Sequence, residues 1–223
     1  MNPRAAVLFD LDGTLVDTVP FILSCVRHTF AEYGTGPTDA EWTVGIGTPL
    51  ALQLAQFARH PEDVPALFER YRGHWNAHHD AATKTFPGAR ETVEALAARG
   101  HPLAIVTAKS VHGAVRTLEH TGLLPFMGAV IGADSCARCK PHPDPVLLAL
   151  ERLGASPRGA VLLGDSSHDL AAARAAGVLA LGAAWGVSTP DALRSAGASR
   201  VLTHIRELPG VLMEISHADA PAP

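Results

Sequence analysis

Residues 10–18 read DLDGTLVDT, and they follow directly on the apolar run AAVLF at residues 5–9. A short apolar run closed by a Gly-Thr turn predicts a buried strand of a parallel sheet. Because Asp10 and Asp12 alternate with Leu11, an extended backbone would point both carboxylates to the same side. Two carboxylates this close repel each other, and a divalent cation or a shared proton would relieve the repulsion. The alternative interpretation is a polar strand end with an Asx-type turn at Asp12 and Gly13.

The composition limits the classes of protein. The chain has 223 residues, of which 47% are hydrophobic, enough for one core and a small insert. A net charge of −4 gives no basic footprint for nucleic acid, and no apolar stretch has the length of a membrane span. The first residues lack a signal-peptide pattern, so we expect a cytoplasmic protein, monomeric or homodimeric. Cys25, Cys136 and Cys139 are expected as reduced thiols rather than as a zinc site or a redox switch.

The pattern along the chain predicts two kinds of structure. After residue 86, short apolar strands alternate with amphipathic helices, which predicts a parallel sheet covered on both faces. Residues 19–84 read as helices only and predict an insert that could act as a lid over the strand ends. The predicted fold is therefore α/β: a doubly wound, Rossmann-like core at 1–16 and 86–216, a helical insert at 17–85, and a disordered tail at 217–223.

Polar residues follow three further predicted strands. Thr107 stands at the start of a helix, where a hydroxyl and free N–H groups can bind an anion, although a plain helix cap is the alternative. Lys140 precedes the proline-fixed turn at 141–145, and its alternative is a solvated surface lysine. Asp165 ends an apolar strand, and Asp169 lies one helical turn further on. Two carboxylates exceed what helix capping requires, so this pair favours a functional role.

Together these strand ends predict phosphoryl transfer. Hard cations such as Mg²⁺ prefer carboxylate oxygens, substrate oxygens and water. A lysine and a helix N-terminus require an anion. A metal, a lysine and oriented N–H groups around one point are the usual surroundings of a transferring phosphoryl group.

The motifs resemble, in order, the four motifs of the haloacid dehalogenase-like hydrolase superfamily. They are DLDGTLVD at 10–17, Thr107, Lys140 with its following proline, and GDSSHD at 164–169. The KPHPDP segment at 140–145 and the surrounding core resemble phosphoglycolate phosphatases. The pairs at 71–72 and 79–80 are similar to a group of bacterial pyrophosphatases. The resemblance implies a small helical cap between the first and second motifs, which fits the insert.

The resemblance also implies a role for each site residue. Asp10 would be the nucleophile and Asp12 the general acid and base, while Lys140 and Thr107 complete the catalytic set. The implied metal is Mg²⁺, and its expected ligands are Asp10, the Leu11 carbonyl, Asp12, Asp165 and Asp169. The expected substrate contacts are Thr107, Ala108, Lys140, Thr48, Arg72 and His79. Ala108 departs from the Asn or Ser that often follows the threonine, but only its N–H is needed.

The expected partner is a small anionic phosphorylated substrate, with no nucleic acid and no membrane. Core resemblance favours a phosphoglycolate-like phosphomonoester, and cap resemblance favours pyrophosphate. A sugar phosphomutase and a non-catalytic phosphate-binding module remain as alternatives. A non-catalytic module would be expected to lack an acid or the lysine, and this sequence has them all.

Overall fold

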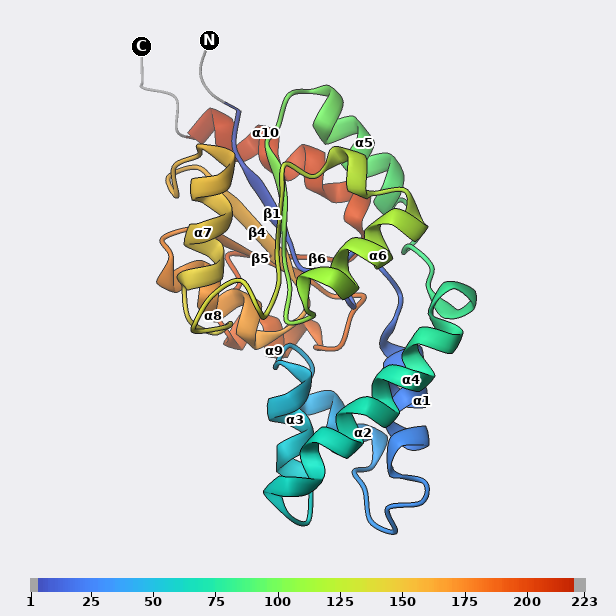
Figure 1. Cartoon of the computed structure of the whole chain (residues 1–223). Coiled ribbons are helices and arrows are strands. Elements are labelled where there is room, and N and C mark those ends of the chain that lie inside the picture. Colours follow the sequence, from blue (N-terminus) through green and yellow to red (C-terminus); the bar gives the residue numbers. More distant parts are fainter. Residues whose placement is uncertain (1–3, 219–223) are drawn as a thin grey trace.

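The computed structural model describes residues 4–218 (Figure 1). Its centre is a six-stranded sheet in which all paired strands are parallel, with the order β3-β2-β1-β4-β5-β6. The strands are β1 (Val7–Phe9), β2 (Leu103–Val106), β3 (Ala129–Ile131), β4 (Val161–Gly164), β5 (Leu179–Ala183) and β6 (Arg200–Leu202). The strand order reverses at β1, so the carboxyl end of β1 lies where open α/β sheets bind their ligands.

Helices cover both faces of this sheet, as the sequence predicts. One face packs against α5 (Ala89–Ala98), α6 (Val111–Thr121) and α10 (Leu208–Ala218). The other packs against α7 (Asp144–Leu153), α8 (Ser167–Ala175) and α9 (Pro190–Ser195). Along β1, Val7 and Phe9 face the first group and Leu8 faces the second. Burial on both faces explains why the strands read as continuous apolar runs.

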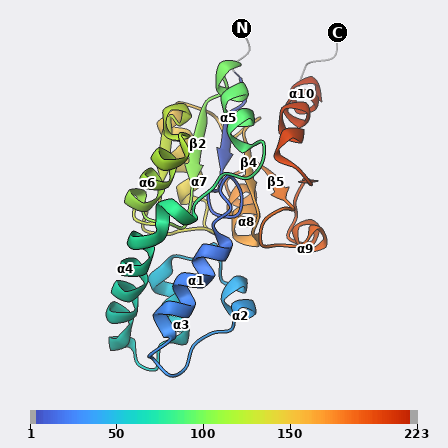
Figure 2. The same cartoon turned by 90° about the vertical axis from the view of Figure 1, so that its right-hand side faces the viewer.

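The insert forms a separate helical unit with its own hydrophobic cluster. Its helices are α1 (Val19–Phe30), α2 (Asp39–Val44), α3 (Leu50–Phe57) and α4 (Val64–Ala82), and a 3-10 turn at Pro61–Asp63 precedes α4. Trp42, Leu54 and Leu67 are buried at the centre of this cluster. Figures 1 and 2 show the four helices gathered beneath the carboxyl ends of the strands.

The chain enters and leaves the helical unit through two paired segments. Val16 forms an antiparallel bridge with Thr85. The N–H of Asp17 donates to the Lys84 carbonyl at 2.8 Å, and the N–H of Phe86 donates to the carbonyl of the residue before Val16 at 3.0 Å. We call these two segments, residues 15–17 and 84–86, the neck. The neck joins the insert to the core directly beside the site that the motifs predict.

Local signals set the ends of several elements. Gly122 and Gly154 end α6 and α7 with φ of 69° and 61°, a left-handed conformation that glycine adopts without strain. The predicted tail begins at residue 217, whereas α10 continues to Ala218; residues 219–223 lie outside the described residues. None of the helices within residues 4–218 has the length and apolar character needed to cross a membrane.

Candidate active site

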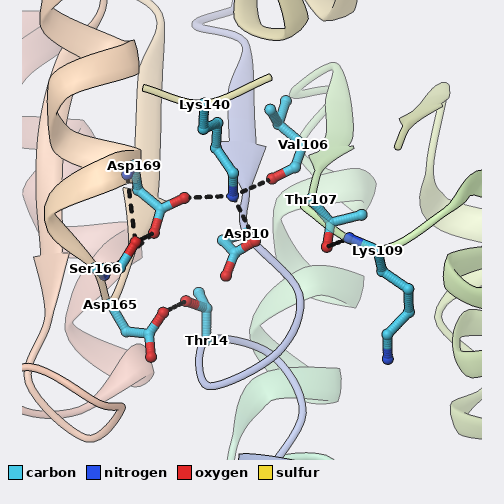
Figure 3. Close-up of polar contacts among 9 residues, drawn as sticks. All are labelled: Asp10, Thr14, Val106, Thr107, Lys109, Lys140, Asp165, Ser166 and Asp169. Atoms are coloured by element: carbon cyan, nitrogen blue, oxygen red, sulfur yellow. Dashed lines mark hydrogen bonds and ion pairs between the residues drawn. The ribbon is translucent and has the colours of Figure 1, made fainter. Parts of the chain in front are cut away.

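The nucleophile predicted from the first motif lies at the end of β1 and contacts a buried lysine. The N–H of Asp10 donates to the Leu163 carbonyl, which extends the pairing of β1 with β4 by one residue. Lys140 Nζ donates to Asp10 Oδ1 at 2.8 Å, to Asp169 Oδ1 at 2.5 Å and to the Val106 carbonyl at 3.0 Å (Figure 3). All three donors of the ammonium group therefore have a partner in the protein.

The carboxylates around this lysine carry an excess of negative charge. Burial raises the pKa of Asp10 to about 7, and the charge of Lys140 opposes this rise while that of Asp169 adds to it. Burial, together with Asp10 and Asp169, also raises the pKa of Asp165 well above its ordinary value. For Lys140, burial acts to lower the pKa, but the two neighbouring carboxylates outweigh it and the pKa is raised. One ammonium thus faces three carboxyl groups, which leaves the site short of positive charge.

A divalent cation fits this deficit. Asp10, Asp165 and Asp169 each offer an oxygen that lies within 4.8 Å of the oxygens offered by the other two, and all three residues are buried. The donor set is made of oxygen alone, which suits a hard cation. The two oxygens of Asp169 already accept hydrogen bonds, Oδ1 from Lys140 and Oδ2 from the N–H and hydroxyl of Ser166. Asp10 and Asp165 therefore have more capacity for direct ligation than Asp169.

Asp165 is held by two loops that come very close to it. The N–H of Val187 donates to its Oδ2 at 2.8 Å, and Thr14 Oγ1 lies 3.4 Å from its Oδ1. A Cβ added at Gly13 or at Gly186 would lie 2.1 Å or 2.2 Å from Asp165 Oδ2, so both positions require glycine. The sequence reasoning missed Gly186. It lies three residues after the end of β5, so a search of the loop after every predicted strand could have found it.

Asp12 lies apart from the cluster of three carboxylates. Its Oδ1 accepts hydrogen bonds from Thr18 Oγ1 at 2.6 Å and from Lys109 Nζ at 2.8 Å. The sequence analysis named Asp12 among the metal ligands, and the structure does not bring its side chain to the carboxylates of Asp10, Asp165 and Asp169. This position suits instead the general acid and base, because Asp12 lines the same cavity as Asp10.

The Leu11 carbonyl, which the sequence analysis expects to bind the metal, has several hydrogen-bond donors around it. The Leu11 carbonyl accepts hydrogen bonds within the turn after β1, from the N–H groups of Thr14, Leu15 and Val16. Among the described residues, no such bond ends on the carbonyl oxygen of Asp12. The Leu11 carbonyl is therefore a poor ligand here, and the Asp12 carbonyl is the freer oxygen of the two.

A cavity lined by residues of both the core and the insert lies beside Asp10, Asp12 and Asp165, whereas Lys140 and Asp169 do not line it. Its volume is about 540 Å³. The core contributes Asp10, Asp12 and Asp165, together with Thr107 and Ala108 after β2. The insert contributes, among others, two of the predicted substrate contacts, Thr48 and Arg72.

The structure places the last predicted substrate contact, His79, outside the residues that line this cavity. His79 lies in the last turn of α4, which packs on α6, and its side chain is fully buried. Its Nε2 contacts Thr117 Oγ1 at 2.9 Å and its Nδ1 contacts Asp80 Oδ1 at 2.6 Å. Burial lowers the pKa of His79, although Asp80 opposes this shift. His79 joins the insert to the core and has no ring nitrogen left for a substrate.

A second contact joins the insert to the core on the other side of the cavity. Gly47, in the loop between α2 and α3, has φ of 103°. A Cβ at this position would lie 3.0 Å from Ser166 Oγ and 3.2 Å from His168 Nδ1. The loop at 47–49, which contains the predicted substrate contact Thr48, thus lies against the core beside Asp165.

Comparisons with known proteins agree with this arrangement. The family model of the haloacid dehalogenase-like hydrolases matches residues 7–183. A pyrophosphatase PpaX from Halalkalibacterium halodurans is 35% identical over 203 residues, which cover 91% of this chain and 94% of the relative. A phosphoglycolate phosphatase from Agrobacterium fabrum is 35% identical over 193 residues, which cover 83% of this chain and 82% of the relative.

Solved structures are similar over almost the whole chain. A hydrolase from Pseudomonas syringae has a TM-score of 0.86 and 26% identity, and the match covers 96% of this chain and 99% of that one. A haloacid dehalogenase-like family hydrolase from Streptococcus pneumoniae has a TM-score of 0.81 and 26% identity, with 95% and 99% covered. Both matches include the helical insert as well as the core.

Proposed function

Because the chain belongs to the haloacid dehalogenase-like hydrolases and has the phosphatase motifs of that family, we propose that it hydrolyses a small phosphomonoester through an aspartyl-phosphate on Asp10. One observation carries this proposal. Asp10 is held by Lys140 in a cavity that Asp12 also lines, so a nucleophile and an acid meet at one substrate site. Asp12, the second aspartate of the first motif, favours phosphate chemistry, because the dehalogenases of the superfamily lack an aspartate there.

The first half of the reaction uses both aspartates. Lys140 occupies Asp10 Oδ1 and leaves Oδ2 to attack phosphorus. A bond forms between this oxygen and phosphorus, and the bond between phosphorus and the ester oxygen breaks. Asp12 gives its proton to the departing oxygen, which leaves as an alcohol.

The second half returns the enzyme to its starting state. Asp12, now ionised, takes a proton from water, and the resulting hydroxide attacks the phosphorus of the aspartyl-phosphate. The bond to Asp10 breaks and inorganic phosphate is released. Thr107 and the N–H of Ala108 would hold the phosphoryl oxygens in both halves, and the ammonium of Lys140, which is bound to three protein oxygens, would offset their negative charge and orient Asp10.

A bound Mg²⁺ would supply positive charge against the phosphoryl oxygens and the buried carboxylates. Asp10 and Asp165 would be its direct side-chain ligands, with the carbonyl oxygen of Asp12, and Asp169 would act through water. The raised pKa values of Asp10 and Asp165 support this assignment, since both arise from burial and from neighbouring negative charge.

For the substrate we propose phosphoglycolate first and pyrophosphate second. The phosphoglycolate phosphatase and the pyrophosphatase described above are both 35% identical to this chain, and the pyrophosphatase match covers more of both chains, so identity alone does not rank the two substrates. The residues at 140–145 in the core favour phosphoglycolate, and the residues of the insert favour pyrophosphate. Both ligands carry a second negative group, which suits the cationic side chains in the cavity.

A panel of substrates tests the proposal. We expect phosphate release in the presence of Mg²⁺, with kcat/KM highest for phosphoglycolate, then pyrophosphate, then glucose phosphates. A preference of about tenfold or more for a neutral sugar phosphate, or ~1.4 kcal/mol of transition-state binding, would reverse this order. An isomerised sugar phosphate as product would identify a mutase, and no release from any substrate would indicate a non-catalytic module.

A further inference from the structure

Lys109 is a cation inside the active-site cavity that the sequence analysis did not assign. It follows Thr107 by two residues and precedes α6, and its side chain lines the cavity. Its Nζ donates to Asp12 Oδ1 at 2.8 Å, and both side chains are only 14% exposed. Lys109 is therefore bound to the side chain that acts as acid and base in the proposed reaction.

Lys109 also contacts the insert. Lys109 Nζ lies 5.5 Å from the centre of the Trp75 ring, which belongs to α4. A cation over an aromatic face is stabilised, and more strongly where water is excluded. The guanidinium of Arg116 lies 5.1 Å from the same ring and donates to Asn76 and Asp80 on α4. These contacts place Lys109 at the interface between the core and the insert, next to Asp12.

The other cations near the site are less suited to receive a substrate charge. Lys140 uses all three donors on protein oxygens, as described above. Arg72 lines the cavity, but its side chain is 50% exposed, and its guanidinium lies 3.9 Å from Glu69 and over the Phe68 ring. Water screens an exposed charge of this kind. Lys109 is shielded, and its ammonium has three donors, of which one is hydrogen-bonded to a protein acceptor within residues 4–218.

We propose that Lys109 determines substrate specificity by binding a second negative charge on the leaving group, and that the same contact releases Asp12. This inference rests on the proposed function. In the structure, Lys109 and Thr18 both hold Asp12 Oδ1, which ties Asp12 to the residue at the start of α1. A carboxylate or phosphate on the leaving group competes for Lys109, so its arrival loosens Asp12 beside the oxygen that must be protonated. A neutral leaving group provides no such competitor.

The test compares two esters that differ in one charge: phosphoglycolate and its amide, 2-amino-2-oxoethyl phosphate. We expect the wild-type enzyme to prefer phosphoglycolate in kcat/KM by about tenfold or more. In Lys109→Met, kcat/KM for phosphoglycolate should fall about 10- to 100-fold, the range for loss of a charge-assisted contact. The value for the amide should change less than about threefold, so the preference disappears.

Three further variants separate specificity from structure. Lys109→Arg keeps the charge and should keep part of the preference. Lys84→Met makes the same chemical change at an exposed lysine that does not line the cavity, and the preference should be unchanged. Arg72→Met should retain a clear preference for phosphoglycolate.

Several outcomes would overturn the inference. An equal fall for both esters in Lys109→Met would assign Lys109 a structural role, and loss of the preference in Arg72→Met alone would assign the anion site to Arg72. A wild-type enzyme that hydrolyses both esters without preference would also refute it and leave the proposed function intact. Failure to release phosphate from either ester would instead contradict the proposed function and the inference with it.

Discussion

At the scale of single residues, the site depends on the charge of one carboxylate. Replacing Asp10 with Asn keeps its shape but removes both the nucleophile and a metal ligand. Lys140 still has Asp169 and the Val106 carbonyl as acceptors, so the fold should survive. We expect kcat to fall on the order of 10³-fold or more, with a thermal melt close to that of the wild type. Near-wild-type turnover would refute the covalent mechanism.

Gly186 tests how closely the backbone must approach Asp165. In Gly186→Ala, the new Cβ would meet Asp165 Oδ2 at 2.2 Å and the Gly13 carbonyl at 2.5 Å, so Asp165 has to move. A displacement of about 1 Å in an active site can cost about 100-fold, and we expect kcat/KM to fall by about tenfold or more. The apparent affinity for Mg²⁺ should fall as well.

A matched control for this change is Gly210→Ala in α10. This glycine has no neighbour within 4 Å of an added Cβ, and alanine favours the helix. Activity should stay at the wild-type level. If Gly186→Ala and Gly210→Ala have the same kcat/KM, the close approach of residue 186 to Asp165 does not matter for activity.

At the scale of elements, the contact of α4 with α6 predicts a pH-dependent stability. The titratable and charged groups that face His79 are Asp80 on its own helix, and Arg116, Lys109 and His120 from the core, in addition to its partner Thr117. Burial lowers the pKa of His79 below 6.5, so the unfolded chain takes up a proton at a higher pH than the folded chain. The contribution of His79 is therefore complete above about pH 6.5 and declines as the pH falls toward the folded-state value.

The measurement is a series of thermal melts between pH 8 and pH 5 for the wild type and His79→Gln. We expect the melting temperature of the wild type to fall more steeply below about pH 6.5 than that of the variant, because glutamine does not titrate. His142→Gln is the control, since His142 is exposed and should leave the slope unchanged. Parallel curves for the wild type and His79→Gln would show that the buried imidazole does not set this dependence.

Elements also show how far the sequence could predict the site. Asp10, Thr107 and Asp165 each follow an apolar strand, and parallel strands bring their carboxyl ends to one edge. The structure places these residues together for that reason. The strand order, with the first strand between β2 and β4, agrees with the expected doubly wound fold.

The sequence could not predict contacts that depend on how the insert docks. His79 stands in a polar stretch and resembles a substrate ligand in sequence, but the packing of α4 on α6 buries it against Thr117. Lys109 is separated from Asp12 by 97 residues, and no local pattern indicates that the two meet. Such contacts between distant segments depend on how the helices pack together. The pattern of apolar residues predicts the helices but does not specify this packing.

At the scale of the whole molecule, a metal at the junction of core and insert should control both activity and stability. Asp10, Asp165 and Asp169 repel each other, and a cation that binds only the folded chain stabilises it by mass action. We expect dialysis against EDTA to abolish phosphate release and lower the melting temperature, and Mg²⁺ to restore both. Calcium should inhibit, because its larger and looser shell would displace Asp10 from in-line attack. Full activity after exhaustive EDTA dialysis would exclude a metal requirement.

The neck has a consequence for how such enzymes diversify. Its two segments are already hydrogen-bonded to each other, so the helices beyond them begin and end at almost the same point of the core. A genetic exchange of everything between residues 17 and 84 would leave the sheet, its register and the phosphate-binding groups of the core intact. Recombination can therefore replace one insert with another, and the descendants of one gene can acquire different phosphate-ester substrates while the catalytic core stays the same.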